Sequence, residues 1–329
     1  MSTRRRWHRT AVLAVLATVI SAAPAAGETM WGGVWQDFPF GENTAQRFPH
    51  FGDPDLVIGN NFNTYGQYYN LAASATTLYS GRSYSVHQWD VVSGAEIGPL
   101  GLDSPLSDHL EAGLFAIGTS SAGDLLFSPA GYSTEQRTVA KYSADGTWLR
   151  DYTTPQLQHV QGTPTANSEV VFMASRFNMG AGWTEEILMF AEDAAFLGNF
   201  GSEMNGDVGD AAIMGNSLYA INYIDDGVFV YDLNGTENPT YSHLIPFPPE
   251  VNPDAFFLDQ LTASGGFLYI GDTPDAAWYK LDLSGNLLGS YVAEIVGDMN
   301  ALGSIVVPEP TGIALLGLGA GLLAVRRRR

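Results

Sequence analysis

Short apolar runs alternate with turns rich in aspartate, asparagine and glycine over most of the chain. Five segments share one pattern: a strand-like run that ends at an aromatic residue or a leucine, then a turn, then a second apolar run. Their aligned anchor residues are Trp89, Tyr142, Phe190, Tyr231 and Leu281, spaced by 53, 48, 41 and 50 residues. Turns such as A-D-G, L-N-G and L-S-G-N supply the positive φ angles that tight hairpins need. The pattern predicts an antiparallel hairpin in each segment.

A further apolar run precedes the hairpin in the last four segments. These runs begin at Gly123, Ser168, Asn216 and Gly266. A repeat of about 45 residues that holds about four short antiparallel strands is typical of one blade of a propeller. The sequence therefore predicts an all-β fold, a β-propeller of about six blades, with five or seven blades as the alternatives.

The last apolar segment of the repeat region has no hairpin after it. The stretch V-G-D-M-N-A-L-G-S-I-V-V, from Val296, resembles V-G-D-A-A-I-M-G-N-S-L-Y, from Val208, where a new repeat begins. It therefore reads as the start of a blade that the chain does not finish. We expect residues near the N-terminus to complete this blade, because such an exchange closes the ring and removes two exposed strand edges.

Two segments, Gly265–Leu288 and Phe115–Phe127, resemble the NHL-type propeller repeat. The segment around Phe190 departs most from the shared pattern, because Ala194 stands where the others have glycine. The resemblance implies a propeller fold. It implies no particular activity, since propellers of this kind carry many unrelated functions.

The N-terminal segment has the features of a secretory signal peptide. Arginines between Arg4 and Arg9 form a basic region, and the ten apolar residues Ala11–Ile20 are too few to span a bilayer comfortably. Small residues follow, and Ala23-Pro24-Ala25 fits a cleavage site. We therefore expect residues 1–27 to be a signal peptide with its own helix, and the protein to be exported.

The C-terminal segment combines two prolines, a short apolar stretch and four arginines. As a helix, Thr311–Val325 would be about 22 Å long at 1.5 Å per residue, against about 30 Å for the hydrocarbon core of a bilayer. Pro308, Glu309 and Pro310, followed by this stretch and by the arginines at the chain end, resemble the PEP-CTERM sorting signal of exopolysaccharide-producing bacteria.

The resemblance implies a short C-terminal transmembrane helix that anchors the protein transiently in the inner membrane. It also implies processing near the tripeptide by an exosortase-type transpeptidase, after which the protein is at the cell surface or extracellular, either attached or released. On this interpretation Pro308, Glu309 and Pro310 are a recognition element and take no part in catalysis. The expected organisation is a signal peptide at 1–27, a propeller domain at 28–304 and a sorting segment at 305–329.

Charge narrows the range of partners. Eight of the 15 basic residues lie in the two terminal segments, which leaves seven basic and 34 acidic residues between Glu28 and Val307, a net charge of −27. Such a surface repels nucleic acid and anionic lipid, because phosphate binding depends on lysine and arginine. The sequence has no cysteine, which excludes disulfides and thiolate chemistry.

Acidic residues recur at the predicted starts of the blades, where they would border a central channel. They are Asp53, Asp108, Asp210, Asp259 and Asp298. A ring of carboxylates is a candidate Ca²⁺ site, since Ca²⁺ takes about six to eight oxygen ligands. The alternative is that each aspartate tightens its own turn.

Aromatic residues are dense near the N-terminus, and Trp31 and Trp35 are candidates for stacking on sugar rings. The alternative is that they pack the first blade. We expect a cell-surface or matrix-associated protein that binds a glycan or another protein without catalysis. A metal-dependent hydrolase of the lactonase type and a purely structural envelope protein are the alternatives. No catalytic residue is assigned, because no serine has a base that the sequence identifies and the histidines are isolated.

Overall fold

The computed structural model describes most of the chain between residues 28 and 308. The described ranges are 28–36, 43–49, 55–62, 71–74, 76–82, 84–110, 113–129, 138–157, 159–160, 163–167, 170–178, 183–204, 208–222, 227–233, 239–251, 260–272, 277–292 and 299–308. The backbone divides into two compact units, Met30–Val307 and the two chain ends beyond it. The first unit holds the repeats and is described below.

The regular secondary structure among the described residues of this region is almost entirely β-strand. The strands are β1 (Glu28–Gln36), β2 (Asn43–Pro49), β3 (Leu56–Phe62), β4 (Leu71–Ala73), β5 (Thr77–Arg82), β6 (Ser85–Asp90), β7 (Glu96–Pro99), β8 (Leu114–Thr119), β9 (Leu125–Pro129), β10 (Thr138–Tyr142), β11 (Trp148–Thr153), β12 (His159–Val160), β13 (Thr165–Ala166), β14 (Val170–Asn178), β15 (Trp183–Ala191), β16 (Phe196–Phe200), β17 (Val208–Met214), β18 (Ser217–Asn222), β19 (Gly227–Asp232), β20 (Thr240–Pro246), β21 (Gln260–Ser264), β22 (Phe267–Asp272), β23 (Ala277–Asp282), β24 (Leu287–Val292) and β25 (Met299–Pro308). Two short 3₁₀ helices, η1 (Leu106–Asp108) and η2 (Ser202–Met204), lie in connecting segments.

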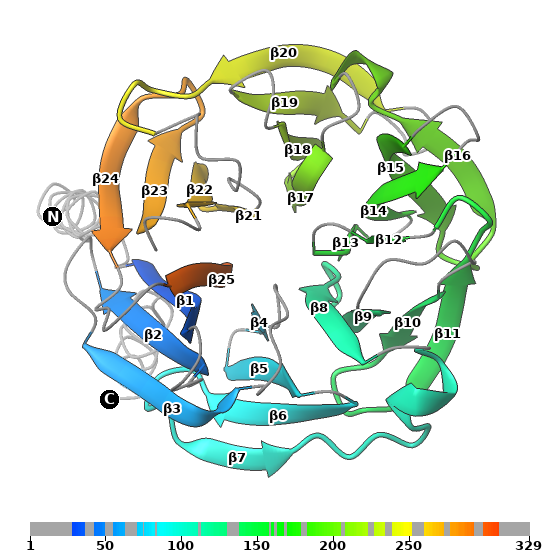
Figure 1. Ribbon diagram of the computed structural model, residues 1–329, viewed down its shortest axis with the longest axis vertical. Coiled ribbons are helices and arrows are strands. Elements are labelled where there is room, and N and C mark those ends of the chain that lie inside the picture. Colours follow the sequence, from blue (N-terminus) through cyan, green and yellow to red (C-terminus); the bar gives the residue numbers. More distant parts are fainter. Residues whose placement is uncertain are drawn as a thin grey trace, which may run out of the picture. The chain divides into compact units, whose positions relative to one another are not determined.

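Within the described residues, the strands form six sheets (Figure 1). Five of them are built from strands that follow one another along the chain: β4 to β7, β8 to β11, β12 to β16, β17 to β20, and β21 to β24. The sixth has the order β25-β1-β2-β3, so the last strand of the chain completes the sheet that the first strands begin. The predicted strand exchange is confirmed, with β25 in the place that β17 holds in its own sheet.

The anchor residues predicted from the repeats occupy equivalent positions. Trp89, Tyr142, Phe190, Tyr231 and Leu281 each lie in the third strand of a sheet, and each is buried. In all five sheets the register with the fourth strand shifts between the anchor and the residue directly before it. A bulge at this point bends the strand and increases its twist. The repeated pattern therefore marks a bulge at the same place in each of these sheets, next to a buried aromatic residue or leucine.

The sheets pack face to face through buried apolar residues. Five clusters each combine residues of two sheets that follow one another along the chain. The remaining interface joins the last sheet to the first: the Phe48 ring lies 5.3 Å from that of Trp278 and 5.9 Å from that of Tyr291. Gly32 of β1 packs directly on this indole, because a Cβ atom there would lie 2.5 Å from the Trp278 ring. Together these interfaces close the sheets into a ring.

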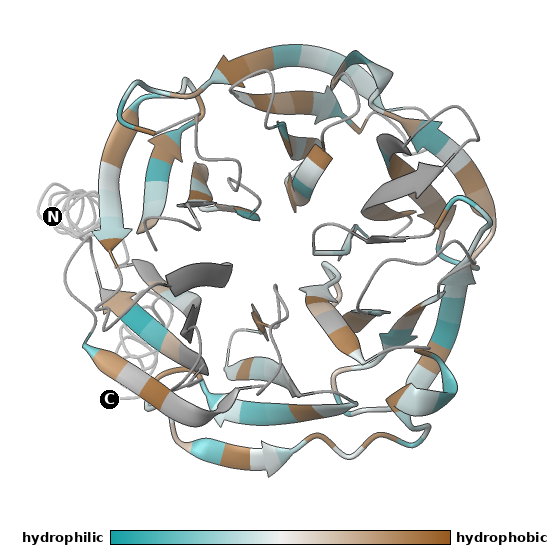
Figure 2. Ribbon diagram, viewed as in Figure 1, coloured by the Kyte–Doolittle hydropathy of each residue, from teal (hydrophilic) through white to brown (hydrophobic). Residues whose placement is uncertain are grey.

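The outermost strands are mostly exposed, as the burial of β7 and β20 shows. Polar and apolar residues follow one another in bands along these strands (Figure 2). This pattern is expected of a strand with only one face against the core.

The turn around Ala194 is strained. Ala194 has φ +71°, whereas glycine takes the equivalent place in the turns at Gly146 (φ +92°) and Gly285 (φ +84°). A left-handed conformation costs an L-residue about 1–2 kcal/mol. We therefore expect Ala194→Gly to stabilise the protein by about 0.5 kcal/mol, after the larger chain entropy of unfolded glycine is offset. Urea unfolding would measure this gain.

A matched control is Gly215→Ala. Gly215 has φ +63°, and nothing lies within 4 Å of the place where its Cβ would be, so the substitution isolates the backbone term. It should destabilise the protein by about 1 kcal/mol. A loss of stability in Ala194→Gly would contradict the assigned strain.

The predicted signal peptide and sorting segment lie outside the described residues, apart from Pro308 at the end of β25. Within the described ranges, no helix has the length and apolar character needed to cross a membrane.

Candidate functional site

Innermost strands of five sheets line a cavity of about 580 Å³. These strands are β4, β8, β13, β17 and β21, and the residues just beyond β8 and just before β13 complete the wall. Figure 1 shows the five strands facing the middle of the ring. A molecule in this cavity would therefore touch several sheets at once.

The described lining of the cavity combines polar and apolar residues and is nearly uncharged. Its hydrogen-bonding side chains include Thr119, Ser120, Thr163, Thr165, Asn167 and Thr262. Asp210 is the only charged residue among the described residues of the wall, and none of these is aromatic. Hydroxyl, amide and peptide groups can both donate and accept hydrogen bonds, which suits a neutral polar ligand.

Asp210 joins three sheets. Its side chain is buried, and Oδ1 accepts hydrogen bonds from the backbone N–H of Thr163 (2.7 Å) and Ala211 (2.8 Å). Oδ2 accepts the backbone N–H of Leu261 (2.9 Å). Thr163 precedes β13, Ala211 lies in β17 and Leu261 in β21, so one carboxylate connects three neighbouring sheets. Asp210 therefore connects the innermost parts of three sheets through hydrogen bonds. The sequence analysis expected it either to bind Ca²⁺ or to tighten its own turn, and neither expectation describes this role.

The other aspartates predicted to form a ring are not seen beside it. Asp108 lies in η1, is exposed, and is not part of the cavity wall. Asp53, Asp259 and Asp298 lie outside the described residues. Among the residues that the structure describes, no three His, Cys, Asp or Glu side chains group as metal ligands would.

Trp31 belongs to the core. It is fully buried and packs with residues such as Ala45 and Leu78, while its indole Nε1 donates a hydrogen bond to the carbonyl oxygen of Val91 at 3.2 Å. A ring that is closed on both faces cannot stack on a sugar, so the alternative of core packing holds for this residue. Trp35 lies in β1, and its side chain is outside the described part of the structure.

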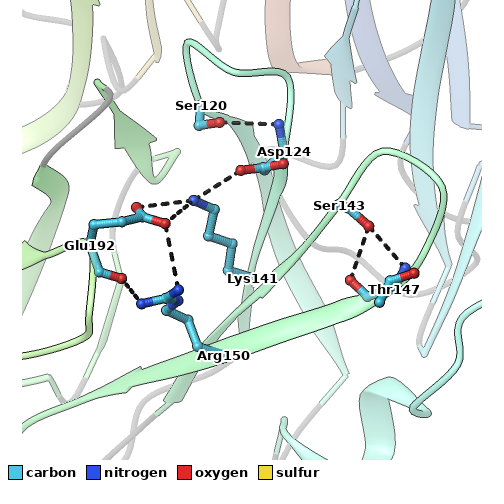
Figure 3. Close-up of polar contacts among 7 residues, drawn as sticks. All are labelled: Ser120, Asp124, Lys141, Ser143, Thr147, Arg150 and Glu192. Carbon is cyan, nitrogen blue, oxygen red and sulfur yellow. Dashed lines mark hydrogen bonds and ion pairs between the residues drawn. The ribbon is translucent and has the colours of Figure 1, made fainter.

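A charged network crosses from the cavity wall to the next sheet (Figure 3). Ser120 of the wall accepts the backbone N–H of Asp124 at 3.1 Å. The Lys141 ammonium lies 2.9 Å from Asp124 Oδ2 and 2.9 Å from Glu192 Oε1, and its side chain is only 4% exposed. Arg150 reaches Glu192 from β11 with a longer contact of 3.8 Å. Because Glu192 follows β15, this network clamps the sheet of β10 to the sheet of β15.

The sequence contains only two lysines, and both occupy the same place in the repeat. Lys141 directly precedes the anchor Tyr142, and Lys280 directly precedes Leu281. Both are buried, and the Lys280 ammonium lies 3.8 Å from the centre of the Phe267 ring. The position before the anchor thus holds a buried cation in two sheets.

A second polar cluster lies between β7 and β11, away from the cavity wall. His109 Nε2 is 2.9 Å from Ser104 Oγ, and His109 Nδ1 is 2.9 Å from Asp151 Oδ2. The Tyr142 hydroxyl donates to the carbonyl oxygen of Ser104 at 2.8 Å. Burial raises the pKa of Tyr142, and the Asp151 carboxylate raises it further, so the phenol stays protonated.

Sequence reasoning assigned no base to any serine and missed this cluster. Ser104 and His109 are five residues apart, but Asp151 is 42 residues further on and belongs to another sheet. No local motif connects them.

Comparison with known proteins supports the fold. No known protein-family profile matches this chain, and no curated protein sequence matches it either. Among solved structures, a chain in the crystal structure of a nidogen/laminin complex aligns with a TM-score of 0.56. The alignment covers 86% of this chain and 99% of that one at 8% sequence identity. The chain is a β-propeller.

A functionally unknown protein from Desulfotomaculum acetoxidans DSM 771 is also similar to the propeller. It aligns with a TM-score of 0.47 and 14% identity over 83% of this chain and 89% of its own. At 8% identity the likeness to the chain of the nidogen/laminin complex shows the architecture alone, because propellers host unrelated activities.

Proposed function

We propose that this protein is an exported propeller that binds a neutral polar ligand, foremost a glycan, in its central cavity. The observation that carries the proposal is the cavity of about 580 Å³, whose nearly uncharged wall combines hydroxyl and amide side chains with apolar residues. This volume is in the range of small-molecule sites. Each of the six sheets would then be one blade of the ring, and innermost strands of five of them would face the ligand.

Charge and hydrogen bonding favour a neutral ligand. The net charge of −27 between Glu28 and Val307 repels anionic polymers. Both oxygens of Asp210 already accept backbone N–H groups. The main role of this carboxylate in the described wall is therefore to stabilise the fold, and ligand binding does not depend on its charge. A sugar offers hydroxyl groups that both donate and accept, which matches the threonine and serine hydroxyls of the wall.

The binding proposal is tested by filling the cavity. Thr119 lies in β8 on the cavity wall, and Thr119→Phe would occupy part of the volume. We expect this variant to lose at least about tenfold in affinity on an array of neutral glycans, because the new phenyl side chain and the ligand compete for the same space. Thr240→Phe, the same change on the exposed end of β20, is the matched control and should bind as the parent does. Folded parent protein that binds nothing on the array would contradict a glycan ligand.

A protein ligand is the second candidate. The structural neighbour with the higher TM-score comes from a complex of nidogen with laminin, so this architecture occurs in a protein–protein assembly. A ligand of this kind would cover the face around the cavity mouth. Binding that survives Thr119→Phe would favour this candidate over a glycan in the cavity.

We further propose that the chain ends direct export and sorting, as the resemblance to PEP-CTERM signals implies. Residues 1–27 would be removed on export, and an exosortase-type transpeptidase would process the segment near Pro308, Glu309 and Pro310. Mass spectrometry of protein recovered from the cell surface should find a C-terminus upstream of the arginines at 326–329. An intact Arg329 on that protein would contradict this.

A further inference from the structure

The imidazole of His109 is held in one tautomer by its two partners. A carboxylate only accepts hydrogen bonds, so the contact of 2.9 Å with Asp151 Oδ2 places the proton on Nδ1. Nε2 then carries the lone pair and accepts the hydroxyl proton of Ser104, also at 2.9 Å. This is the protonation pattern that a histidine needs in order to act as a general base toward a serine.

Neighbouring aromatic rings restrict the orientation of the imidazole. The Trp148 ring stacks on His109 with centroids 5.3 Å apart and planes 16° apart. The Tyr142 ring meets His109 at 5.9 Å and nearly edge-on, at 86°. Trp148 Nε1 also donates to Asp151 Oδ1 at 3.1 Å, so each oxygen of this carboxylate accepts a hydrogen bond that fixes its position. Such preorganisation is what a catalytic base requires before substrate arrives.

The backbone around Ser104 is also held in place. Its carbonyl oxygen accepts the Tyr142 hydroxyl, and the preceding residue, Asp103, is bound on both sides. The Asp103 N–H donates to the Gly146 carbonyl oxygen at 3.1 Å, and Asp103 Oδ1 accepts the Trp148 N–H at 2.6 Å. Ser104 itself is partly exposed.

We propose that Ser104 is an activated nucleophile, with His109 as its general base and Asp151 as the residue that positions the imidazole. None of the three belongs to the wall of the central cavity, so this site is separate from the binding site proposed above. Its substrate class is neutral esters, since Asp103 and Asp108 on the same segment disfavour an anionic acyl donor.

The reaction is acyl transfer to water. Ser104 Oγ attacks the carbonyl carbon of the ester while its proton passes to His109 Nε2. The bond from that carbon to the alcohol oxygen breaks, and the proton on Nε2 passes to the departing alcohol. Water then attacks the acyl-serine with His109 again accepting a proton, which releases the carboxylic acid and restores the Ser104 hydroxyl.

The experiment uses a fluorophosphonate probe on the full-length protein. Serine attack on phosphorus forms an O–P bond and expels fluoride, and His109 takes the hydroxyl proton, so the probe needs only the nucleophile and its base. We expect labelling at Ser104, located by peptide mass spectrometry, at least about 100-fold faster than in heat-denatured protein. Ser104→Ala should abolish the label, and Ser107→Ala, an exposed serine of the same segment, should leave it unchanged.

Variants of the other two residues separate catalysis from structure. His109→Gln and Asp151→Asn should each slow labelling at least about tenfold, and Asp151→Glu should restore part of the rate. Melting temperatures recorded beside each rate show whether the variant is folded. The proposal is overturned if the folded parent protein is not labelled at Ser104. It is also overturned if a folded His109→Gln protein is labelled at the parent rate, because the cluster would then only attach the segment to β11.

Discussion

Asp210→Ala is expected to destabilise the protein by about 3–5 kcal/mol, because it leaves two buried N–H groups and one part-buried N–H group without their acceptor. Each buried donor that loses its partner costs about 1–3 kcal/mol. The donors on Ala211 and Leu261 lie in β17 and β21, and the donor on Thr163 lies two residues before β13, so the three bonds connect three sheets. The loss therefore falls on the contacts between innermost strands, where the ring is narrowest. Urea unfolding followed by tryptophan fluorescence would measure it.

Asp210→Asn tests whether the negative charge of Asp210 is needed, because asparagine has nearly the same shape as aspartate. The amide can offer one oxygen, but its NH₂ group would then face an N–H donor in place of an acceptor. We expect a loss nearly as large as for alanine.

The control for Asp210 is an aspartate in an exposed turn. Asp282 Oδ1 also accepts two backbone N–H groups, from Ser284 at 2.8 Å and Asn286 at 2.9 Å. Hydrogen bonds with the Asn286 side chain and backbone lower the pKa of Asp282. Water can replace this carboxylate, so Asp282→Ala should cost far less than Asp210→Ala. Equal losses for the two variants would show that burial is not what makes Asp210 important.

Lys141→Met should destabilise the protein by about 2–4 kcal/mol. It removes the buried cation between two carboxylates, Asp124 and Glu192, while leaving both of them in place. Breaking a buried ion pair from one side is costly because the remaining charge is uncompensated. The partners are 21% and 41% exposed, which places the expected loss toward the lower part of the range for buried pairs. The change in unfolding free energy measures it.

Two further variants show whether the loss comes from uncompensated charge. A triple variant that adds Asp124→Asn and Glu192→Gln to Lys141→Met should recover most of the stability, because no carboxylate is then left without its buried cation. Arg150 loses its contact with the Glu192 carboxylate in this variant, but it is 34% exposed, so water solvates its charge. Arg150→Met should cost less than Lys141→Met, since Arg150 is 34% exposed and its ion-pair contact with Glu192 is longer, at 3.8 Å. A triple variant no more stable than Lys141→Met would contradict this account.

Much of the fold could be predicted because its signals are local. Each anchor is set by a strand pattern and a turn within a dozen residues, and Tyr142 and Tyr231 are buried in third strands as the pattern indicates. The closing strand could be predicted because β25 repeats the sequence of β17. The sequence also showed the departure at Ala194, where other repeats have glycine. The structure gives this residue a φ of +71°, the conformation that glycine adopts in the equivalent turns.

The candidate sites could not be predicted in the same way. Trp31 lies in a run of apolar and glycine residues whose alternation does not say which face is buried, and it proved to be in the core. Asp210 was singled out as a channel residue, but its partners Thr163 and Leu261 are 47 and 51 residues away. The distance along the chain hides which N–H groups meet the carboxylate.

The sequence by itself determined the repeat, the turns, the anchors, the strand that closes the ring and the acidic net charge. Each of these follows from neighbours along one strand or one hairpin. Only the tertiary structure decided that Lys141 meets Glu192, that Asp210 joins three sheets, and that His109 lies between Ser104 and Asp151. Such contacts cross between strands and sheets whose twist and stacking set which side chains face one another, and no local pattern specifies that geometry.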